Sequence, residues 1–428
     1  MFKNMVQVNA FFQSRNKLGI KPGLERIQKL LYLQGNPENK LKAIHVAGTN
    51  GKGSTIQYIN NALMANDYRV GVFTSPSMDG LEGHILDNNH PISKEVFLEL
   101  INALYPSINQ LDKEGMQPSE FEIITVLAIM YFSSNVDIAI IEAGMGGRED
   151  TTNCFIPILS IITNVDKDHT AFLGDTIEQI TYHKAGIIKE GAPVVVGEVK
   201  DSSFKIIEAE ARLKKVPIYC INKDFYYNNL SIKGNLQQFY WNDKTGNNLF
   251  INLKMQGEHQ VKNSSLAIMA LTLMKEKGFR LDVSHAIEAI KTSTVPGRFE
   301  VVYNHPMVII DGAHNTAGIQ TFLQTVSVQE TGKQKHLIFA GFKDKDLQTM
   351  VNQCLPYFDS ITLTSFQHPR AASVSEMLSF VNSRKVTVEP HWKSFMHKVT
   401  ELDEVDYYVT GSLHFITMVR KFFTKKKI

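Results

Sequence analysis

The stretch HVAGTNGKGST, residues 45–55, decides the fold expected for this chain. The apolar run 43–47 predicts a buried strand, and the pattern of residues 55–65 predicts a helix after it. A glycine-rich turn at a helix N-terminus presents N–H groups and the helix dipole to a phosphate. The spacing is unusual for a phosphate loop, because Gly53 separates Lys52 from Ser54. The turn by itself leaves a purely structural role open.

Four further apolar runs follow the same pattern and are bounded by Gly, Pro or Asp. They cover residues 69–75, 137–144, 159–165 and 193–197. Such runs, separated by helical stretches, predict a parallel sheet with crossover helices. Residues 230–256 instead alternate around a turn at 242–246, which predicts an antiparallel hairpin at a sheet edge. We therefore expect an α/β fold with a mixed, mainly parallel sheet.

The length of the chain, 428 residues, exceeds what one hydrophobic core usually supports. The stretch TSTVPGRFE, residues 292–300, is typical of a linker, so we place a boundary near Pro296. This predicts an ATPase-like domain over residues 1–295 and a smaller domain over residues 296–428. Five strand-like runs in the second part predict a Rossmann-like, doubly wound α/β domain.

Composition limits the classes of function. The chain is 43% apolar and 21% charged with a net charge of +2, which gives no reason to expect a nucleic-acid partner. Its three cysteines are far apart and form no CxxC pair, which suits a reducing compartment and argues against a zinc ribbon. There is no signal-peptide pattern and no apolar run of about 18 residues. We expect a soluble, cytoplasmic protein without membrane contact.

Two other stretches carry chemistry. Glu142 follows an apolar run, at the strand end where open α/β sheets gather ligands, and a carboxylate there suits Mg²⁺. The alternative is that Glu142 caps a helix or pairs with Arg148. Residues 163–191 supply His169 and Lys184 after a third strand. Taken alone, each of these two side chains is more often structural or solvated than functional.

Seven motifs in one order point to a known family. They are HVAGTNGKGST, TSP at 74–76, EAGMGGREDTTN at 142–153, DHT at 168–170 with LGDTI and KAGIIK, PGRFE at 296–300, IDGAHN at 310–315 and TGSL at 410–413. In these motifs the chain resembles the folylpolyglutamate synthase and dihydrofolate synthase family of the Mur ligase superfamily. The resemblance implies a two-domain enzyme, generally monomeric, that joins a folate or pteroate carboxylate to the amine of L-glutamate and hydrolyses ATP.

The resemblance also implies roles for individual residues. The ATP-binding positions are Gly48, Thr49, Asn50, Gly51, Lys52, Gly53, Ser54, Asn263, Arg298 and Asp311. The substrate-binding positions are Gly23, Leu24, Phe121, Glu122, Asp150 and Ser412. Lys52, Lys184 and His314 are implied to be catalytic.

Two magnesium sites are implied. Ser75 and Glu142 would hold the first ion, which explains why the loop does not need a standard hydroxyl after Lys52. His169 and Lys184 would hold the second ion, with Lys184 carried as a carbamate formed with carbon dioxide. Carbamylation makes chemical sense because an ammonium repels Mg²⁺, whereas a carbamate is an anionic oxygen ligand.

One loop departs from the family pattern. The family commonly has an Asn-Glu-Arg-Ile tetrad after TSPHL, whereas this chain has Glu82, Gly83 and His84 before Ile85. A glutamate and an arginine are thus missing from a substrate loop, which predicts an altered acceptor preference or weakened activity. Glu149 and Asp166-Lys167 also differ from residues usual in the family.

Three other functions compete with a folate ligase. A cell-wall precursor ligase of the same superfamily is disfavoured by GKGST and DGAHN. A binding protein that retains ATP but has lost catalysis would have no need of the metal ligands. A motor or signalling ATPase would carry switch segments, which nothing in the sequence resembles.

Overall fold

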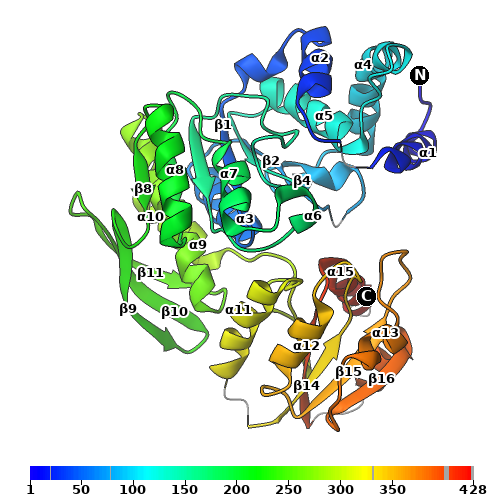
Figure 1. Ribbon diagram of the computed structural model, residues 1–428. Coiled ribbons are helices and arrows are strands. Elements are labelled where there is room, and N and C mark those ends of the chain that lie inside the picture. The colour runs from blue at the N-terminus through cyan, green and yellow to red at the C-terminus, as the bar shows by residue number, and fades with distance from the viewer. Residues whose placement is uncertain (20, 78, 330–331, 400–403, 426–428) are drawn as a thin grey trace. The chain divides into compact units, whose positions relative to one another are not determined.

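The computed structural model describes residues 1–19, 21–77, 79–329, 332–399 and 404–425 (Figure 1). The chain forms two compact units. Unit 1 comprises Met1–Leu253 and Val261–Ser293, and unit 2 comprises Lys254–Gln260 and Thr294–Ile428. The segment 254–260 therefore belongs to unit 2, an excursion that the sequence pattern does not predict.

The main sheet of unit 1 has eight strands in the order β4-β3-β2-β5-β1-β6-β7-β8. The five predicted strands are confirmed as β1 (Ala43–Ala47), β2 (Val70–Phe73), β5 (Ile138–Glu142), β6 (Leu159–Ile162) and β7 (Val194–Val196). These pair in parallel, as does β8 (Ile218–Cys220). Antiparallel pairing enters at one edge through β3 (Ile85–Asp87) and β4 (His90–Pro91). The sheet is thus mixed and mainly parallel.

The predicted hairpin forms, but its predicted place at the edge of this sheet is wrong. β10 (Leu236–Asp243) and β11 (Asn248–Leu253) pair antiparallel and join β9 (Phe225–Lys233) in a separate three-stranded sheet (Figure 1). Phe239 and Trp241 are buried, whereas Tyr240 between them is 39% exposed. A sheet that buries one face needs only a cover on that face and does not need a place in the main sheet.

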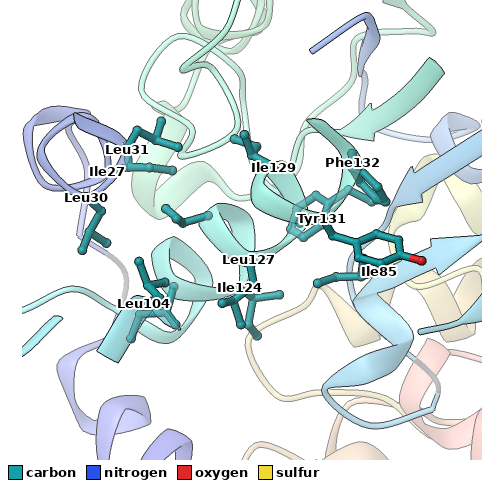
Figure 2. Close-up of a cluster of buried hydrophobic side chains, with 14 of the residues drawn as sticks. Ile27, Leu30, Leu31, Ile85, Leu104, Ile124, Leu127, Ile129, Tyr131 and Phe132 are labelled. Atoms are coloured by element: carbon teal, nitrogen blue, oxygen red, sulfur yellow. The ribbon is translucent and has the colours of Figure 1, made fainter. Parts of the chain in front are cut away.

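Helices cover both faces of the main sheet. The helices that begin before residue 293 are α1 (Met5–Arg15), α2 (Glu25–Leu33), α3 (Lys52–Met64), α4 (Lys94–Lys113), α5 (Glu120–Asn135), α6 (Thr170–Leu173), α7 (Ile177–Ala185), α8 (Asp201–Leu213), α9 (Glu258–Glu276) and α10 (Val283–Thr292). Phe73 and Ile141 belong to a hydrophobic cluster with apolar residues of α2, α4 and α5. Figure 2 shows part of this cluster. Ile162 and Val194 pack in another cluster, with residues of α7 and α8. This double cover explains why the parallel strands are mainly apolar along their whole length.

Unit 2 contains a six-stranded sheet in the order β12-β13-β17-β14-β15-β16. Its strands are β12 (Glu300–Asn304), β13 (Met307–Ile310), β14 (Gln334–Phe339), β15 (Ser360–Ser365), β16 (Val386–His391) and β17 (Val405–Thr410). All pairs are parallel except β12 with β13. The first of the five predicted runs, residues 301–315, is therefore two strands and not one, because the chain turns back at His305-Pro306.

Successive residues of β14 show that this sheet is doubly wound. Leu337 and Phe339 pack in a cluster with residues of α11 (Thr316–Ser327), α12 (Leu347–Cys354) and α13 (Val374–Ser379). Ile338 packs instead with residues of α14 (Trp392–Val399) and α15 (Leu413–Lys425). Alternate side chains of a strand point to opposite faces, so both faces are covered by helices. In the part of the chain that the structure describes, no helix is both long and apolar enough to span a bilayer.

Candidate active site

The glycine-rich turn lies between β1 and α3, as the sequence predicts. Gly51 is the N-cap of α3 and adopts a left-handed conformation with φ of 81°. A Cβ atom at Gly51 would lie 2.4 Å from Oδ1 of Asn263, on α9. Glycine is therefore required here both for the backbone conformation and for the close approach of Asn263. The predicted ATP-binding residue Asn263 is thus beside the loop.

Two residues that the sequence analysis missed hold the loop in place. Oδ1 of Asn164 accepts hydrogen bonds from the N–H groups of Thr49, at 3.2 Å, and Asn50, at 2.8 Å. The Thr163 hydroxyl donates to the Asn50 carbonyl at 2.6 Å. Both residues directly follow β6, which lies next to β1. Their signal in the sequence is only a Thr-Asn pair after a predicted strand.

Gly48→Ala is expected to destabilise unit 1, because a Cβ atom there would lie 1.8 Å from the Thr163 hydroxyl oxygen. Overpacking of this kind costs about 1–3 kcal/mol. Gly53→Ala is the matched control: apart from the neighbouring backbone of α3, no atom of the described residues lies within 4 Å of its Cβ position, in the first turn of that helix. Alanine in a helix is favoured over glycine by about 0.5–1 kcal/mol. Urea unfolding of both variants measures the difference, and equal stabilities would contradict the prediction.

Lys52 and Glu142 lie beside the loop. The Lys52 ammonium donates to the Gly48 carbonyl at 3.1 Å and is 4.0 Å from Oε1 of Glu142. The other carboxylate oxygen accepts from the Thr74 hydroxyl at 2.6 Å and from the Ser75 N–H at 3.2 Å. The alternative pairing of Glu142 with Arg148 is wrong. The Arg148 guanidinium instead forms an ion pair with Glu210, with Nη2 2.6 Å from Oε2. Thr74 lies in the TSP motif but has no role assigned from the sequence, and the structure adds it to the site.

The sheet topology explains why these residues meet. β2, β5 and β1 are neighbours and run in parallel, so their carboxyl ends share one edge of the sheet. Ser75 follows β2, Glu142 ends β5, and the phosphate loop follows β1. A ligand site at this edge is the usual arrangement in open α/β sheets.

Lys184 is buried in α7, with 3% of its surface exposed. Burial, and secondarily the positive charge of Lys52, lower the pKa of Lys184 to about 7, while Asp168 and Asp150 oppose this shift. His169 is exposed and starts α6 in a left-handed conformation, with φ of 52°. Among the described residues, His, Cys, Asp and Glu form no group of three able to hold a metal. The predicted ligand sets are of another kind, since they include Ser75 and Lys184.

Asp150 stabilises the loop that follows β5. Its Oδ2 accepts from the Met145 N–H at 2.7 Å, and its Oδ1 accepts from the Thr152 N–H at 3.0 Å and hydroxyl at 2.5 Å. Burial raises the pKa of Asp150. The ring of Phe121 lies 5.7 Å from that of Phe73 and packs close to Gly144. Phe121 and Asp150, two predicted substrate residues, thus approach the same glycine.

Glu122 has a structural task in addition to any contact with a substrate. Its carboxylate is fully buried, accepts from Nε of Arg26 at 2.8 Å, and closes a capping box with Ser119 at the start of α5. Gly23 and Leu24 lie just before α2, the helix that carries Arg26. Of these predicted substrate residues, Glu122 is thus a member of an ion pair, and Gly23 and Leu24 precede its partner Arg26 in the chain.

Glu122→Gln is expected to lower the free energy of unfolding by about 1.5–3 kcal/mol, the usual value of a hydrogen bond to a charged group. The amide keeps an oxygen for the Ser119 cap but loses the charge opposite Arg26. Glu120→Gln, in the same first turn of α5, removes an equal charge near the helix dipole without touching Arg26. Urea denaturation of the two variants separates the ion pair from the dipole, and matched midpoints would refute the assignment.

The remaining predicted residues lie in unit 2, at the carboxyl ends of β13 and β17. Asp311 accepts from the N–H groups of Phe299 and Ala313, both at 2.9 Å. Burial raises the pKa of Asp311, and the Arg298 charge opposes that shift. Nδ1 of His314 lies 2.8 Å from the Gly312 carbonyl, which can only accept, so Nδ1 carries a proton.

Ser412 is buried at the start of α15, next to the end of β17. Because β17 pairs with β13, the chain segments that carry Ser412 and Asp311 follow adjacent strands. Unit 2 therefore gathers Arg298, Asp311, His314 and Ser412 on one edge of its sheet, while the phosphate loop and predicted metal ligands belong to unit 1.

Comparison with known proteins agrees with this arrangement. Residues 46–271 match the Mur ligase middle domain, and residues 297–412 match the Mur ligase glutamate ligase domain. A dihydrofolate synthase/folylpolyglutamate synthase of Bacillus subtilis is 34% identical over 98% of this chain and 99% of its own.

Solved structures are similar over the same length. A folylpolyglutamate synthase of Thermotoga maritima has 34% identity and a TM-score of 0.86, covering 99% of this chain and 97% of that one. The Mycobacterium tuberculosis folylpolyglutamate synthase, solved with ADP and AMPPCP, has 26% identity and a TM-score of 0.88, with 98% of each chain covered.

The fold and the site define an ATP-dependent ligase of the Mur ligase class. Both of its domain models match, and their order along the chain is that of the two units described above. Within this class, the chain belongs to the folylpolyglutamate synthase/dihydrofolate synthase family.

Proposed function

We propose that this protein uses ATP to join the carboxylate of a reduced folate to the amine of L-glutamate, and that dihydropteroate is a second acceptor. The observation that carries the proposal is the meeting of Lys52, Ser75 and Glu142 beside a phosphate loop at the carboxyl ends of three adjacent strands. The membership of the chain in this family supports the choice of acceptor and amine.

The acceptor carboxylate must first be activated, because a carboxylate is a poor electrophile. Transfer of the γ-phosphoryl group of ATP to a carboxylate oxygen gives an acyl phosphate and ADP. The backbone N–H groups at the start of α3 would bind the phosphates, and Lys52 would stabilise the charge that develops during transfer. The amine of glutamate then attacks the acyl carbon and releases phosphate.

Magnesium would be held by oxygen ligands on unit 1. Glu142 and the hydroxyl of Ser75 suit a hard cation, and Oε1 of Glu142 faces Lys52, beside the phosphate loop. The second set would be His169 and a carbamate on Lys184. A pKa near 7 leaves part of the Lys184 amine neutral at neutral pH, which is the form that reacts with carbon dioxide. A bound Mg²⁺ would neutralise phosphate charge.

In unit 2, His314 and Ser412 would position the incoming glutamate, while Arg298 and Asp311 would bind the nucleotide. The fixed proton on Nδ1 of His314 directs Nε2 away from the Gly312 carbonyl. Positioning by this ring is as consistent with the geometry as proton transfer is. A monomeric state and a cytoplasmic location remain predictions from the sequence.

The test is glutamate-dependent ADP release with ATP and Mg²⁺, comparing tetrahydrofolate, dihydropteroate and no acceptor. Turnover with both acceptors would establish a bifunctional enzyme, and turnover with tetrahydrofolate alone would establish only polyglutamylation. If nucleotide binds but no acceptor gives turnover, the folate-ligase proposal fails and a nucleotide-binding role takes its place.

A further inference from the structure

The loop that departs from the family pattern is attached to the site by His84. Nδ1 of His84 lies 2.8 Å from the Thr74 carbonyl oxygen, and a carbonyl can only accept, so the imidazole donates. The His84 carbonyl in turn accepts from the Thr74 N–H at 3.1 Å. Two hydrogen bonds therefore hold these residues together across the loop. The ring of His84 also lies 6.3 Å from that of Phe73.

Thr74 connects this contact to the predicted metal site. Its hydroxyl donates to Oε2 of Glu142, and the following N–H, that of Ser75, donates to the same oxygen. Glu142 is 6% exposed, so these bonds form where water competes little. A shift of the Thr74 backbone would move the Ser75 hydroxyl and disturb both bonds to Glu142.

Gly83 lets the loop reach this position. A Cβ atom at Gly83 would lie 2.3 Å from the Ser77 hydroxyl oxygen and 3.1 Å from Cβ of Asp79. Ser77 is itself held, because its hydroxyl oxygen accepts from the Asp79 N–H at 3.1 Å. The glutamate that the family commonly has at this position would have to displace the Ser77 hydroxyl and so break its bond with Asp79. The substitutions at positions 83 and 84 therefore belong together.

We propose that His84 is a positioning residue that fixes Thr74 and Ser75 against Glu142, and that Gly83 is its required partner. In place of the glutamate and arginine common in the family, His84 then holds the loop through hydrogen bonds to Thr74, and Gly83 leaves room for Ser77. The loop therefore keeps a function in the site. This inference rests on the proposed role of Ser75 and Glu142 as magnesium ligands.

The experiment measures Mn²⁺ binding to the full-length protein in the presence of ADP by titration calorimetry, without acceptor or glutamate. His84→Leu keeps much of the side-chain volume but removes the donor, so Mn²⁺ affinity is expected to fall about threefold to tenfold, the value of one hydrogen bond. His84→Asn carries an amide N–H near the place of Nδ1 and is expected to restore most of the affinity. His90→Leu, at an exposed position on β4, is the control and is expected to bind Mn²⁺ like the wild type.

The partnership is tested with Gly83→Glu and with the double variant Gly83→Glu/His84→Arg. Gly83→Glu is expected to weaken Mn²⁺ binding as much as His84→Leu does, because the added side chain displaces the Ser77 hydroxyl and shifts the neighbouring His84 away from Thr74. The double variant, which restores the two residues common in the family, is expected to bind more weakly than the wild type. Tighter Mn²⁺ binding by the double variant would overturn the inference.

Two other results would also overturn it: unchanged affinity in His84→Leu, or an equal loss in His84→Asn and His84→Leu, which would indicate packing of the ring and not its hydrogen bond. Failure of the ligase proposal is distinguishable from these results. A wild-type protein that binds Mn²⁺ and ADP but turns over no acceptor contradicts the function alone. A His84→Leu variant with wild-type Mn²⁺ affinity, in a protein that does turn over folate, contradicts this inference alone.

Discussion

Lys52→Met is expected to lower kcat by about 10²–10³-fold, the usual loss when one group that stabilises transition-state charge is removed. The Lys52 ammonium lies at the phosphate loop and faces Glu142, so it is placed to bind a transferring phosphoryl group. Binding of ADP should weaken much less, because the N–H groups of the loop and the start of α3 remain.

Steady-state ADP release and ADP titration calorimetry measure the two effects separately. Lys42→Met is the matched control, since Lys42 is exposed and precedes β1 by one residue. If Lys52→Met lowers ADP affinity as strongly as kcat, then Lys52 contributes mainly to ground-state binding and the catalytic role is wrong.

Lys184→Met is expected to abolish most turnover and yet to stabilise the fold. The loss, about 10²-fold or more, follows from removing a ligand of the proposed second magnesium site. The gain follows from burial: the pKa of Lys184 is about 7 in the folded state, against about 10.4 in an unfolded chain. Since the folded-state pKa is the lower one, the cost of burying the ammonium is fully present below pH 7. It fades as the pH rises from 7 toward 10.

At pH 7 in buffer free of carbon dioxide, Lys184→Met should therefore raise the free energy of unfolding by up to about 4 kcal/mol, at 1.36 kcal/mol per pKa unit. The gain should shrink as the pH approaches 10. Urea unfolding at several pH values measures this. The carbamate is tested by removing bicarbonate, which should slow the wild type reversibly, and by carbon NMR with labelled bicarbonate. Turnover that does not depend on bicarbonate would exclude the carbamate.

Much of unit 1 is predictable from local pattern. β1, β2, β5, β6 and β7 each bury all of their residues, so each appears in the sequence as a short, mainly apolar run. The hairpin at 236–253 is also recognisable, from alternation around a turn. The sheet to which this hairpin belongs is not recognisable from the sequence. Alternation shows which side chains are buried but does not show which strands pair.

The site residues also fall into two groups, those that sequence motifs identify and those that only the structure identifies. Motifs place Lys52, Ser75 and Glu142 at strand ends. Thr163 and Asn164 have no motif of their own, and the role of Thr74, although it lies in the TSP motif, is identified only by its bonds. Likewise Glu122 is fully buried and ion-paired, which a position near the start of a helix does not reveal. The interpretation of Gly83 and His84 also changes. In the sequence they stand for the loss of a glutamate and an arginine, whereas in the structure His84 bonds to Thr74 and Gly83 leaves room for Ser77.

The sequence by itself determined the class of fold, the phosphate loop and the order of the functional motifs, because apolar periodicity and glycine turns are local properties of the chain. Only the tertiary structure decided the strand order that brings Ser75, Glu142 and Lys52 to one edge, the burial that shifts the pKa of Lys184, and the anchoring of His84 to Thr74. These depend on residues far apart in the chain, whose proximity and loss of solvent arise only when the sheet and its covering helices are assembled.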